Sequence, residues 1–495
     1  MFQKIIKDGK KNILPIIYLI FSGLIIYTSL HHEKWVDEAQ PWLISRDLDF
    51  WSLIKQLRYE VTPGLWHFIQ YPFAHLGFPY FTQTILNLIF YLITAYFLLF
   101  RSPFSLPIKI LFIFSYYFSF EYAVVARSYG LTISLLFILL SYFHFRLRYI
   151  FLYSVGLILL AQTNAIGLFL AGSLWLTSWF DFFQLIRAKK PISKFIFFNF
   201  IVLSGLFLSL FQFWPTIDPA RQSTQLFSSI EIPSIINSFV AGFFPFSLLD
   251  LKNFDNFRET VYILNWLNVF LVILIILVII WRFLASRRII IFIFSSFLPL
   301  FFLLGANRVG HLRHYGFFLI IIVAAYWLDQ KISFPTKKTI KEKVFLVFLT
   351  TSLIVLDLVG FRAHYLDQKY LFSDAINLAR FIKKNNLDHQ QIYVSDSYFS
   401  VSILPYLDPN TQFFYLRPQR LGTFFVLDKN FYLTKNDNIN NIIENFVPLD
   451  TKQKSILITT ESISLKNQKK WRLLYQTSGY IMGYDNKRFY LYESR

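Results

Sequence analysis

Long blocks of apolar residues dominate this sequence and limit its fold more than any other feature. Many of them approach the ~20 residues that a helix needs to cross the hydrocarbon core of a bilayer. Of the 495 residues, 55% are hydrophobic and only 16% are charged, whereas soluble domains usually carry about a quarter charged residues. The sequence therefore predicts a polytopic α-helical membrane protein.

The positions of the apolar blocks predict about eleven membrane-spanning helices. The first block follows a lysine-rich start and precedes the charged sequence His31 to Lys34 rather than a small-residue cleavage site. We therefore expect it to be a retained signal-anchor. The expected spans cover residues 13–30, 80–100, 106–121, 128–145, 149–163, 165–183, 194–214, 261–281, 289–305, 314–328 and 344–361.

Positive charge is unevenly distributed between the blocks. Lys and Arg concentrate in alternate loops, including Arg146 with Arg148, Arg282 with Arg287 and Arg288, and the segment 331–343. By the positive-inside rule these loops face the cytoplasm, as does the N-terminus, while the C-terminus faces outward across the plasma (inner) membrane. The basic residues behind the net charge of +19 are therefore expected to set the membrane topology and to contact anionic lipid headgroups, rather than to bind nucleic acid.

Two regions outside the spans are expected to fold on the outer face. The first external loop, residues 31–79, contains amphipathic stretches at 38–47 and 50–58 that are typical of helices lying in the membrane interface. A second external loop is expected at 215–260. The chain is divided into a membrane module, 1–361, and a small α/β domain, 362–495. In that domain we expect a helix at 373–386 and strands at 391–395, 412–416, 455–459 and 488–492.

Adjacent carboxylates, Asp37 and Glu38, follow the first span. An external carboxylate can act as a general base or hold a divalent cation, and external cations can bind a phosphate. Cations expected on the same face are Arg127, Arg308, His311, Arg313 and His314. The simpler alternative is that Asp37 caps the first interfacial helix, because Asp37-x-x-Gln40 fits a capping box. Residue type alone favours the helix cap as the role of Asp37. The residue types do not by themselves identify a reaction. The absence of Cys excludes disulfides and cysteine nucleophiles.

Four segments follow one another along the membrane part of the chain. The first is the Asp37-Glu38 pair after the first span. The others are Thr62 to His67, Glu121 to Leu131 with Arg127, Tyr129 and a following Gly-Leu, and Arg313-His314-Tyr315 at the start of a late span. In this order they resemble the GT-C superfamily of glycosyltransferases, in the branch of protein O-mannosyltransferases and the lipid A aminoarabinose transferase. The resemblance covers residues 10–360 and extends only loosely to the C-terminal domain.

The resemblance implies transfer of a sugar, with inversion, from a polyprenyl-phosphate donor to an external glycan, lipid or protein. Asp37 would be the general base, Glu38 would orient the site or assist with charge, and Glu121 would be a second carboxylate candidate. Residues implied to bind substrate or lipid phosphate are Arg127, Tyr129, His67, Arg313, His314 and Tyr315. Some members use a divalent metal, for which Asp37 is a candidate ligand. The main alternative is a transporter or flippase of lipid-linked precursors, which should show inverted repeats and ionisable residues near the midplane.

Overall fold

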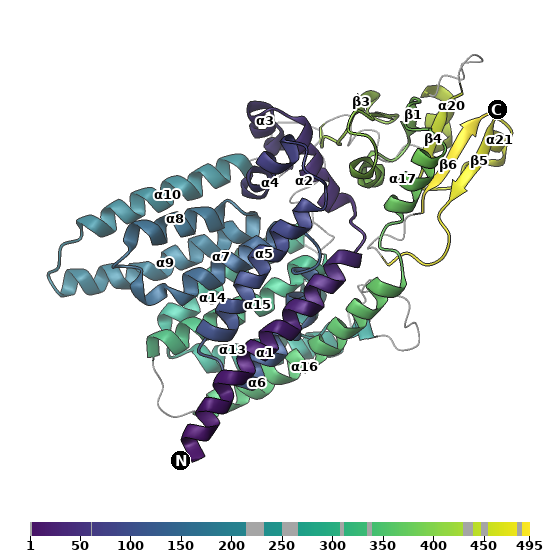
Figure 1. Cartoon of the computed structure of the whole chain (residues 1–495). Coiled ribbons are helices and arrows are strands. Elements are labelled where there is room, and N and C mark those ends of the chain that lie inside the picture. The colour runs from purple at the N-terminus through teal and green to yellow at the C-terminus, as the bar shows by residue number, and fades with distance from the viewer. Residues whose placement is uncertain are drawn as a thin grey trace.

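The protein is a helical bundle that carries a small sheet at one end (Figure 1). The computed structural model describes residues 2–60, 62–213, 232–249, 266–306, 311–333, 339–428, 439–446, 454–482 and 488–495. The two termini lie at opposite ends of the molecule, with the C-terminus beside the sheet. Arg308, one of the cations expected near Asp37, lies outside the described residues.

Within the described residues, eight helices are long and apolar enough to cross a membrane, and they match eight of the expected spans. They are α1 (Phe2–His31), α5 (Thr82–Tyr96) with its π-helical continuation η1 (Phe97–Arg101), α9 (Ala165–Arg187), α10 (Ser193–Phe213), α13 (Trp266–Phe283), α14 (Arg287–Ala306), α15 (Leu312–Ser333) and α16 (Ile340–Lys369). The prediction of a polytopic helical membrane protein is confirmed.

The other three expected spans form shorter helices. They are α6 (Leu106–Phe114), α7 (Ser128–Ser141) and α8 (Ile150–Ala161). Helix α6 ends at Phe114 with Ser115 as its C-cap, and the π-helical turn η2 (Tyr117–Glu121) follows. The 3-10 turn η3 (Phe143–Phe145) separates α7 from α8.

The segment expected as an external loop at 215–260 contains a helix that the sequence did not reveal. Helix α12 (Ile232–Phe243) packs into the bundle, where the ring of Phe239 lies 5.0 Å from that of Phe318. At Gly242 a Cβ atom would come within 2.6 Å of the Tyr315 carbonyl oxygen, so the close approach of α12 to α15 requires glycine. The helix is short and carries Ser and Asn, so it lacks the signal of a span. The 3-10 turn η4 (Phe246–Leu249) follows, and residues 214–231 and 250–265 lie outside the described part of the chain.

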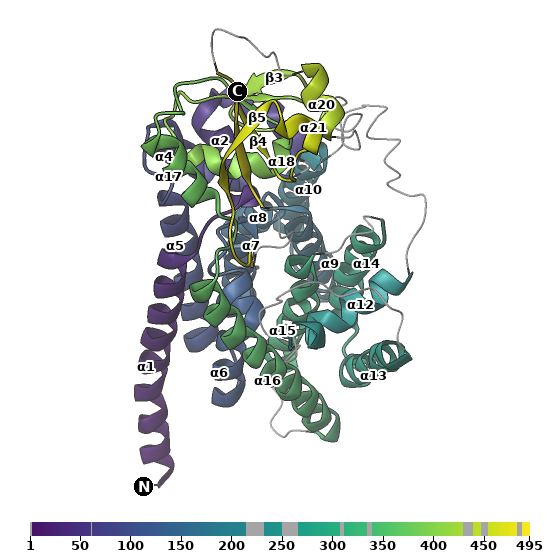
Figure 2. The same ribbon diagram turned by 90° about the vertical axis from the view of Figure 1, so that its right-hand side faces the viewer.

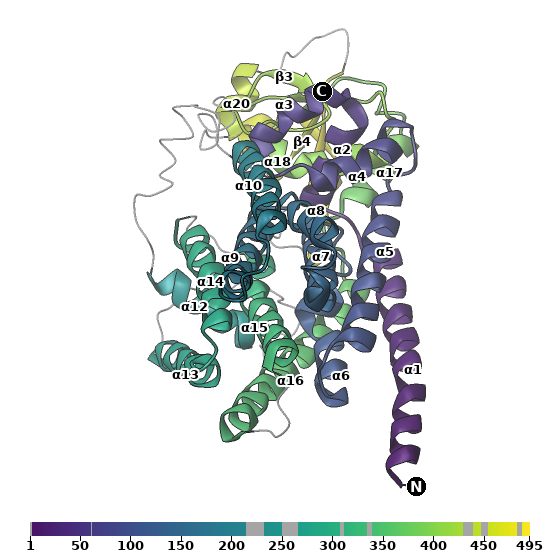
Figure 3. The ribbon, with the colours of Figure 1, turned by 90° about the vertical axis from the view of Figure 1, so that its left-hand side faces the viewer.

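The loop after α1 forms three helices, α2 (Val36–Asp47), α3 (Phe50–Glu60) and α4 (Leu65–His75). Helix α3 behaves as an interfacial helix should: Leu53 is buried, whereas Trp51 is 70% exposed. Helix α2 differs from the expectation, because its apolar residues Trp42 and Leu43 are buried inside the protein rather than exposed to lipid. The C-terminal domain covers it (Figure 3).

The C-terminal domain is an α/β unit, as predicted. Its six-stranded sheet has the order β3-β2-β1-β4-β6-β5, with β1 parallel to both β2 and β4 and the remaining pairs antiparallel. The strands are β1 (Ile392–Val394), β2 (Phe413–Tyr415), β3 (Arg420–Gly422), β4 (Ile456–Thr459), β5 (Trp471–Gln476) and β6 (Tyr490–Ser494). The helical pieces are α17 (Ala375–Lys384), α18 (Ser397–Ser400), the 3-10 helix η5 (Val401–Tyr406), α20 (Ile439–Phe446) and α21 (Leu465–Gln468). The four expected strands all form, and β3 and β5 are additional.

Polar contacts attach this domain to the first loop. The carboxylate of Glu33 accepts hydrogen bonds from the backbone N–H groups of Ser373, Asp374 and Ile376 at 2.9, 2.8 and 3.0 Å, which places a carboxylate at the N-terminus of α17. The Gln40 side chain both donates to and accepts from the backbone of Phe425. The domain is thereby held over α2, at the end of the bundle opposite to the N-terminus (Figure 2).

Candidate functional site

Asp37 lies between two arginines that come from distant segments. Its Oδ2 atom is 3.2 Å from Nη2 of Arg127 and 3.1 Å from Nη1 of Arg313. Its Oδ1 atom accepts a hydrogen bond of 2.8 Å from the Tyr398 hydroxyl. Burial alone would raise the pKa of Asp37, but the two guanidinium groups and Tyr398 outweigh it and hold this pKa well below its usual range. The side chain remains 20% exposed, so solvent or a substrate can reach this carboxylate.

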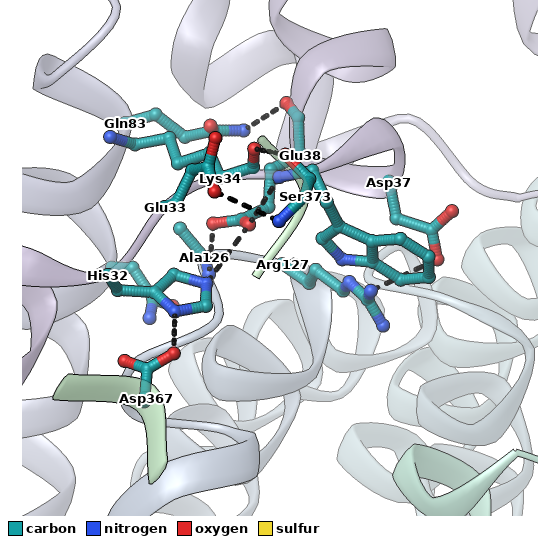
Figure 4. A network of polar contacts seen from close by, with 12 residues as sticks. His32, Glu33, Lys34, Asp37, Glu38, Gln83, Ala126, Arg127, Asp367 and Ser373 are labelled. Carbon is teal, nitrogen blue, oxygen red and sulfur yellow. Dashed lines mark hydrogen bonds and ion pairs between the residues drawn. The ribbon is translucent and has the colours of Figure 1, made fainter. Parts of the chain in front are cut away.

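The helix-cap interpretation of Asp37 is wrong. The N-cap of α2 is Trp35, and the backbone N–H of Trp35 donates to Glu38, 3.3 Å away, rather than to Asp37. Asp37 is therefore the second residue of α2. Its carboxylate is directed to Arg127 instead of to the helix end (Figure 4). With the capping role removed, the ion pairs of Asp37 require another explanation.

Helix starts position both arginines. Arg127 has extended backbone and directly precedes α7, and its guanidinium lies 4.7 Å from the ring centroid of Trp35. Arg313 lies in the first turn of α15, and its backbone carbonyl accepts a hydrogen bond from the Tyr122 hydroxyl. Arg127 and Arg313 have 6% and 12% side-chain exposure. They are thus largely desolvated cations, which bind anions more strongly than cations exposed to water.

Glu38, the other acid of the pair, is fully buried and points away from Asp37 (Figure 4). Its Oε1 atom accepts from the backbone N–H of Ala126 at 2.9 Å, and its Oε2 atom lies 3.5 Å from Nε2 of His32. The Glu38 backbone carbonyl accepts from Gln83. Ala126 immediately precedes Arg127, so Glu38 holds the backbone next to that arginine.

A buried histidine extends this network. Nδ1 of His32 lies 2.9 Å from Oδ1 of Asp367 at the end of α16. Burial by itself would lower the pKa of His32, but the carboxylates of Asp367 and Glu38 prevail and raise this pKa to about 10. His32 is therefore a cation at neutral pH, and it links the end of α1 to both α2 and α16.

Tyr398 is the residue that the sequence analysis missed. It lies in α18, whose N-cap Asp396 accepts from the backbone N–H groups of Tyr398 and Phe399. Burial and the neighbouring Asp37 raise the pKa of Tyr398, so the phenol remains a donor. No sequence signal identifies this residue, because its role depends on how the C-terminal domain docks.

Tyr129 and His314 join the Asp37 cluster. The Tyr129 hydroxyl lies 3.0 Å from Nε2 of His314. Tyr129 is in the first turn of α7, and His314 is in the first turn of α15. His311 is near enough to Asp37 to influence it electrostatically, and burial together with Arg313 lowers the pKa of His311 to about 3. The histidine is therefore neutral at physiological pH. The structure brings together Asp37, Arg127, Tyr129, Arg313 and His314 of the expected site residues.

Three other expected residues occupy separate buried positions. Glu121 ends η2, where its Oε2 atom accepts from Tyr116 at 2.8 Å. Tyr315 is 2% exposed within α15. His67 is buried in α4, burial lowers its pKa to about 4, and neither of its ring nitrogens has a hydrogen-bond partner within the described structure.

A divalent cation at Asp37 finds little support in the surrounding side chains. Among the described residues no group of three or more His, Asp or Glu side chains is arranged to hold a metal ion. Both Asp37 oxygens already face donors, two of them cationic. Two guanidinium groups beside the carboxylate favour an anion over a second cation.

The bundle, the loop helices and the C-terminal sheet together form a fold that is shared with a solved membrane protein. The chain is similar over 98% of both chains to ArnT from Cupriavidus metallidurans, an aminoarabinose transferase, in the crystal structure bound to undecaprenyl phosphate, with a TM-score of 0.52 and 10% sequence identity. For the apo state of the same protein the TM-score is 0.51, with 11% identity and the same coverage. The resemblance inferred from the sequence is confirmed at the level of the fold. No family model and no curated protein sequence matches the chain.

Proposed function

We propose that the protein is a membrane glycosyltransferase that uses a lipid-phosphate sugar donor. The observation that carries this proposal is the position of Asp37 between Arg127 and Arg313, 3.2 and 3.1 Å away. The cations suit the phosphate of a departing lipid, and the carboxylate suits the activation of an acceptor. The fold likeness to ArnT, solved with undecaprenyl phosphate, supports a polyprenyl-phosphate donor.

In the absence of the donor, Asp37 is a poor general base in this proposal. A carboxylate whose pKa is held below its usual range is a weak base. When the donor phosphate binds, it competes with Asp37 for Arg127 and Arg313. The carboxylate then loses its cationic partners and its pKa rises toward the usual value for Asp. Donor binding thus makes Asp37 a better base at the point when one is needed.

In the transfer step, Asp37 takes the proton of the acceptor hydroxyl as the acceptor oxygen bonds to the anomeric carbon. The bond from that carbon to the phosphate oxygen breaks, and its electron pair stays on the phosphate. Arg127 and Arg313 stabilise the negative charge that develops there. Because acceptor and leaving group occupy opposite faces of the sugar, the configuration inverts.

The remaining expected site residues have supporting roles in this proposal. Glu38 positions Arg127 through Ala126, and Tyr129 with His314 borders the phosphate site. His67, Glu121 and Tyr315 are buried, and the role proposed for them is to support the site by packing. The site faces the extracytoplasmic side of the plasma (inner) membrane, because the basic loops belong on the other side. In this arrangement residues 1–361 form the membrane module and residues 362–495 an outer domain.

A direct test follows the covalent fate of the donor. Purified full-length protein is incubated with undecaprenyl-phosphate sugars carrying a radiolabelled sugar, in the presence of membrane lipid and peptidoglycan-derived acceptors. We expect free undecaprenyl phosphate and a labelled product whose anomeric configuration, read by NMR, is opposite to that of the donor. A transporter or flippase would move the donor across proteoliposomes and leave it chemically intact, which would overturn the proposal.

A further inference from the structure

A second polar site lies at the other end of the bundle from Asp37. It is an open pocket of about 500 Å³ between the turn η3, the ends of α9 and α15 and the start of α14. This volume is within the range of small-ligand sites, ~300–1,000 Å³. The charged and titratable residues among its described lining are His144, Arg146, Asp181, Arg287, Arg288 and Lys331.

Part of this lining is a fixed ion-pair network. Arg146 donates two hydrogen bonds of 2.7 Å to the two oxygens of Asp181, and Arg288 donates one of 2.8 Å to Oδ1. The side chains are 13%, 3% and 11% exposed, in the order Arg146, Asp181, Arg288. Both guanidinium groups also lie over rings, those of Phe143 and Phe180 respectively. The walls of the pocket are therefore held in place before anything binds.

The charges of the pocket do not balance. The described lining contains one carboxylate, that of Asp181, and four Arg or Lys side chains. Arg287 and Lys331 make no ion pair with any carboxylate that the structure describes. Helix α14 begins at Arg287, so the positive end of its dipole adds to the excess. A preorganised pocket with uncompensated positive charge favours an anion.

The position of the pocket in the bundle indicates which class of anion it binds. Helices α7 and α15 begin beside Asp37, at Arg127 and Arg313. Helix α15 ends at this pocket, and the turn η3 that follows α7 lines it. Helix α15, with 22 residues, is about 33 Å long at ~1.5 Å per residue, so the pocket lies at the level of the headgroups of the other leaflet. Basic pockets between membrane helices at that level suit anionic lipid headgroups.

We propose that this pocket binds the phosphate group of an anionic phospholipid of the leaflet opposite to the Asp37 site. The phosphate lies between Arg287 and Lys331, while the Arg146–Asp181–Arg288 network forms the floor. Topogenic charge requires Lys and Arg only in the loops. It does not explain their convergence on a hollow large enough for a headgroup.

The test uses the full-length protein in an uncharged detergent and measures binding by calorimetry. The probes are dioctanoyl-phosphatidylglycerol, dioctanoyl-phosphatidylcholine and inorganic phosphate. The pocket variant is Arg287→Gln with Lys331→Gln, which leaves the buried network intact. The matched control is Arg187→Gln with Lys190→Gln, which removes the same charge from exposed positions outside the described lining at the same end of the protein. Thermal unfolding verifies that both variants fold.

We expect phosphatidylglycerol to bind the unaltered protein at least tenfold more tightly than phosphatidylcholine. The pocket variant should weaken this binding about tenfold, and the control should stay within about twofold. The comparison of the two lipids on the unaltered protein tests the proposal even if the variant does not fold. Equal binding of both lipids, or equal losses in both variants, would overturn the proposal. If inorganic phosphate binds and phosphatidylglycerol does not, the ligand is a soluble phosphate and the lipid assignment is wrong.

Discussion

The Tyr398 hydroxyl donates a hydrogen bond of 2.8 Å to Asp37, a residue 361 positions earlier in the chain. The C-terminal domain therefore contributes directly to the candidate site in the membrane module. Glu33 and Gln40 attach the same domain to the first loop through the backbone of residues 373–376 and 425. Docking of the domain and the geometry around Asp37 are consequently linked.

Removing the Tyr398 hydroxyl tests this link. Tyr398→Phe should lower kcat about tenfold, because a hydrogen bond to a charged group contributes about 1.5–3 kcal/mol and here fixes the orientation of the carboxylate. The measurement is steady-state sugar transfer at saturating donor. Tyr393→Phe, on a half-buried ring of β1 in the same domain, is the control and should keep full activity. Equal rates for Tyr398→Phe and the unaltered protein would remove Tyr398 from the site.

Arg127 is expected to bind the donor phosphate. Arg127→Gln should weaken the binding of undecaprenyl phosphate about tenfold to a hundredfold, because a largely buried guanidinium is lost. Arg127→Lys should recover only part of this loss, since an ammonium group lacks the planar fork of a guanidinium. Equilibrium binding of the lipid to purified protein measures both. Arg148→Gln, an exposed arginine elsewhere, should leave the Kd unchanged. Unaltered donor binding in Arg127→Gln would contradict the assignment.

Glu38 is expected to stabilise the buried network around His32 and Ala126 and to take no part in the reaction itself. Glu38→Gln leaves His32 with an incomplete set of partners and removes a charged acceptor from the Ala126 N–H. Breaking a buried pair of this kind costs about 3 kcal/mol, so thermal unfolding should shift to a distinctly lower temperature. Glu461→Gln, at an exposed position, should leave the unfolding temperature unchanged. Lost transfer activity with unchanged stability would instead make Glu38 a reacting group.

The raised pKa of His32 predicts how stability depends on pH. A histidine has a pKa of about 6.5 when unfolded, and that of His32 is about 10 in the fold. The folded state therefore binds the proton more tightly, and its stabilisation is complete below about pH 6.5 and is lost as the pH rises through 10. The stability difference between the unaltered protein and His32→Gln should shrink between pH 6 and pH 10. His31→Gln, at the exposed neighbouring position, should show no such trend. A constant difference for His32→Gln would argue against the charged pair.

The sequence predicted the membrane architecture because hydropathy and span length act locally. It also grouped Asp37 with Arg127 and Arg313, since span ends on one membrane face are limited to a narrow layer. Sidedness does not specify which side chains within that layer touch. Glu38 and Asp37 are adjacent in sequence, yet the first turn of α2 sends one into a buried network with His32 and the other to the arginines.

Long-range docking explains what the sequence did not reveal. Tyr398 reaches Asp37 only because the C-terminal domain folds over α2, and a short helix of four residues leaves no periodic signal. The same docking buries Trp42 and Leu43, which an isolated amphipathic helix would have placed in the interface. Helix α12 was overlooked because close packing against α15, rather than hydropathy, determines its place.

The most direct test of the central claim compares Asp37→Asn with Asp47→Asn, an exposed aspartate at the end of the same helix. Binding of the lipid-phosphate donor and single-turnover sugar transfer are measured on both variants. Asp37→Asn should still bind the donor, since Arg127 and Arg313 remain, while its transfer rate falls about 10²- to 10⁴-fold through loss of the base. Asp47→Asn should match the unaltered protein in both measurements. Transfer at the full rate by Asp37→Asn would contradict the account.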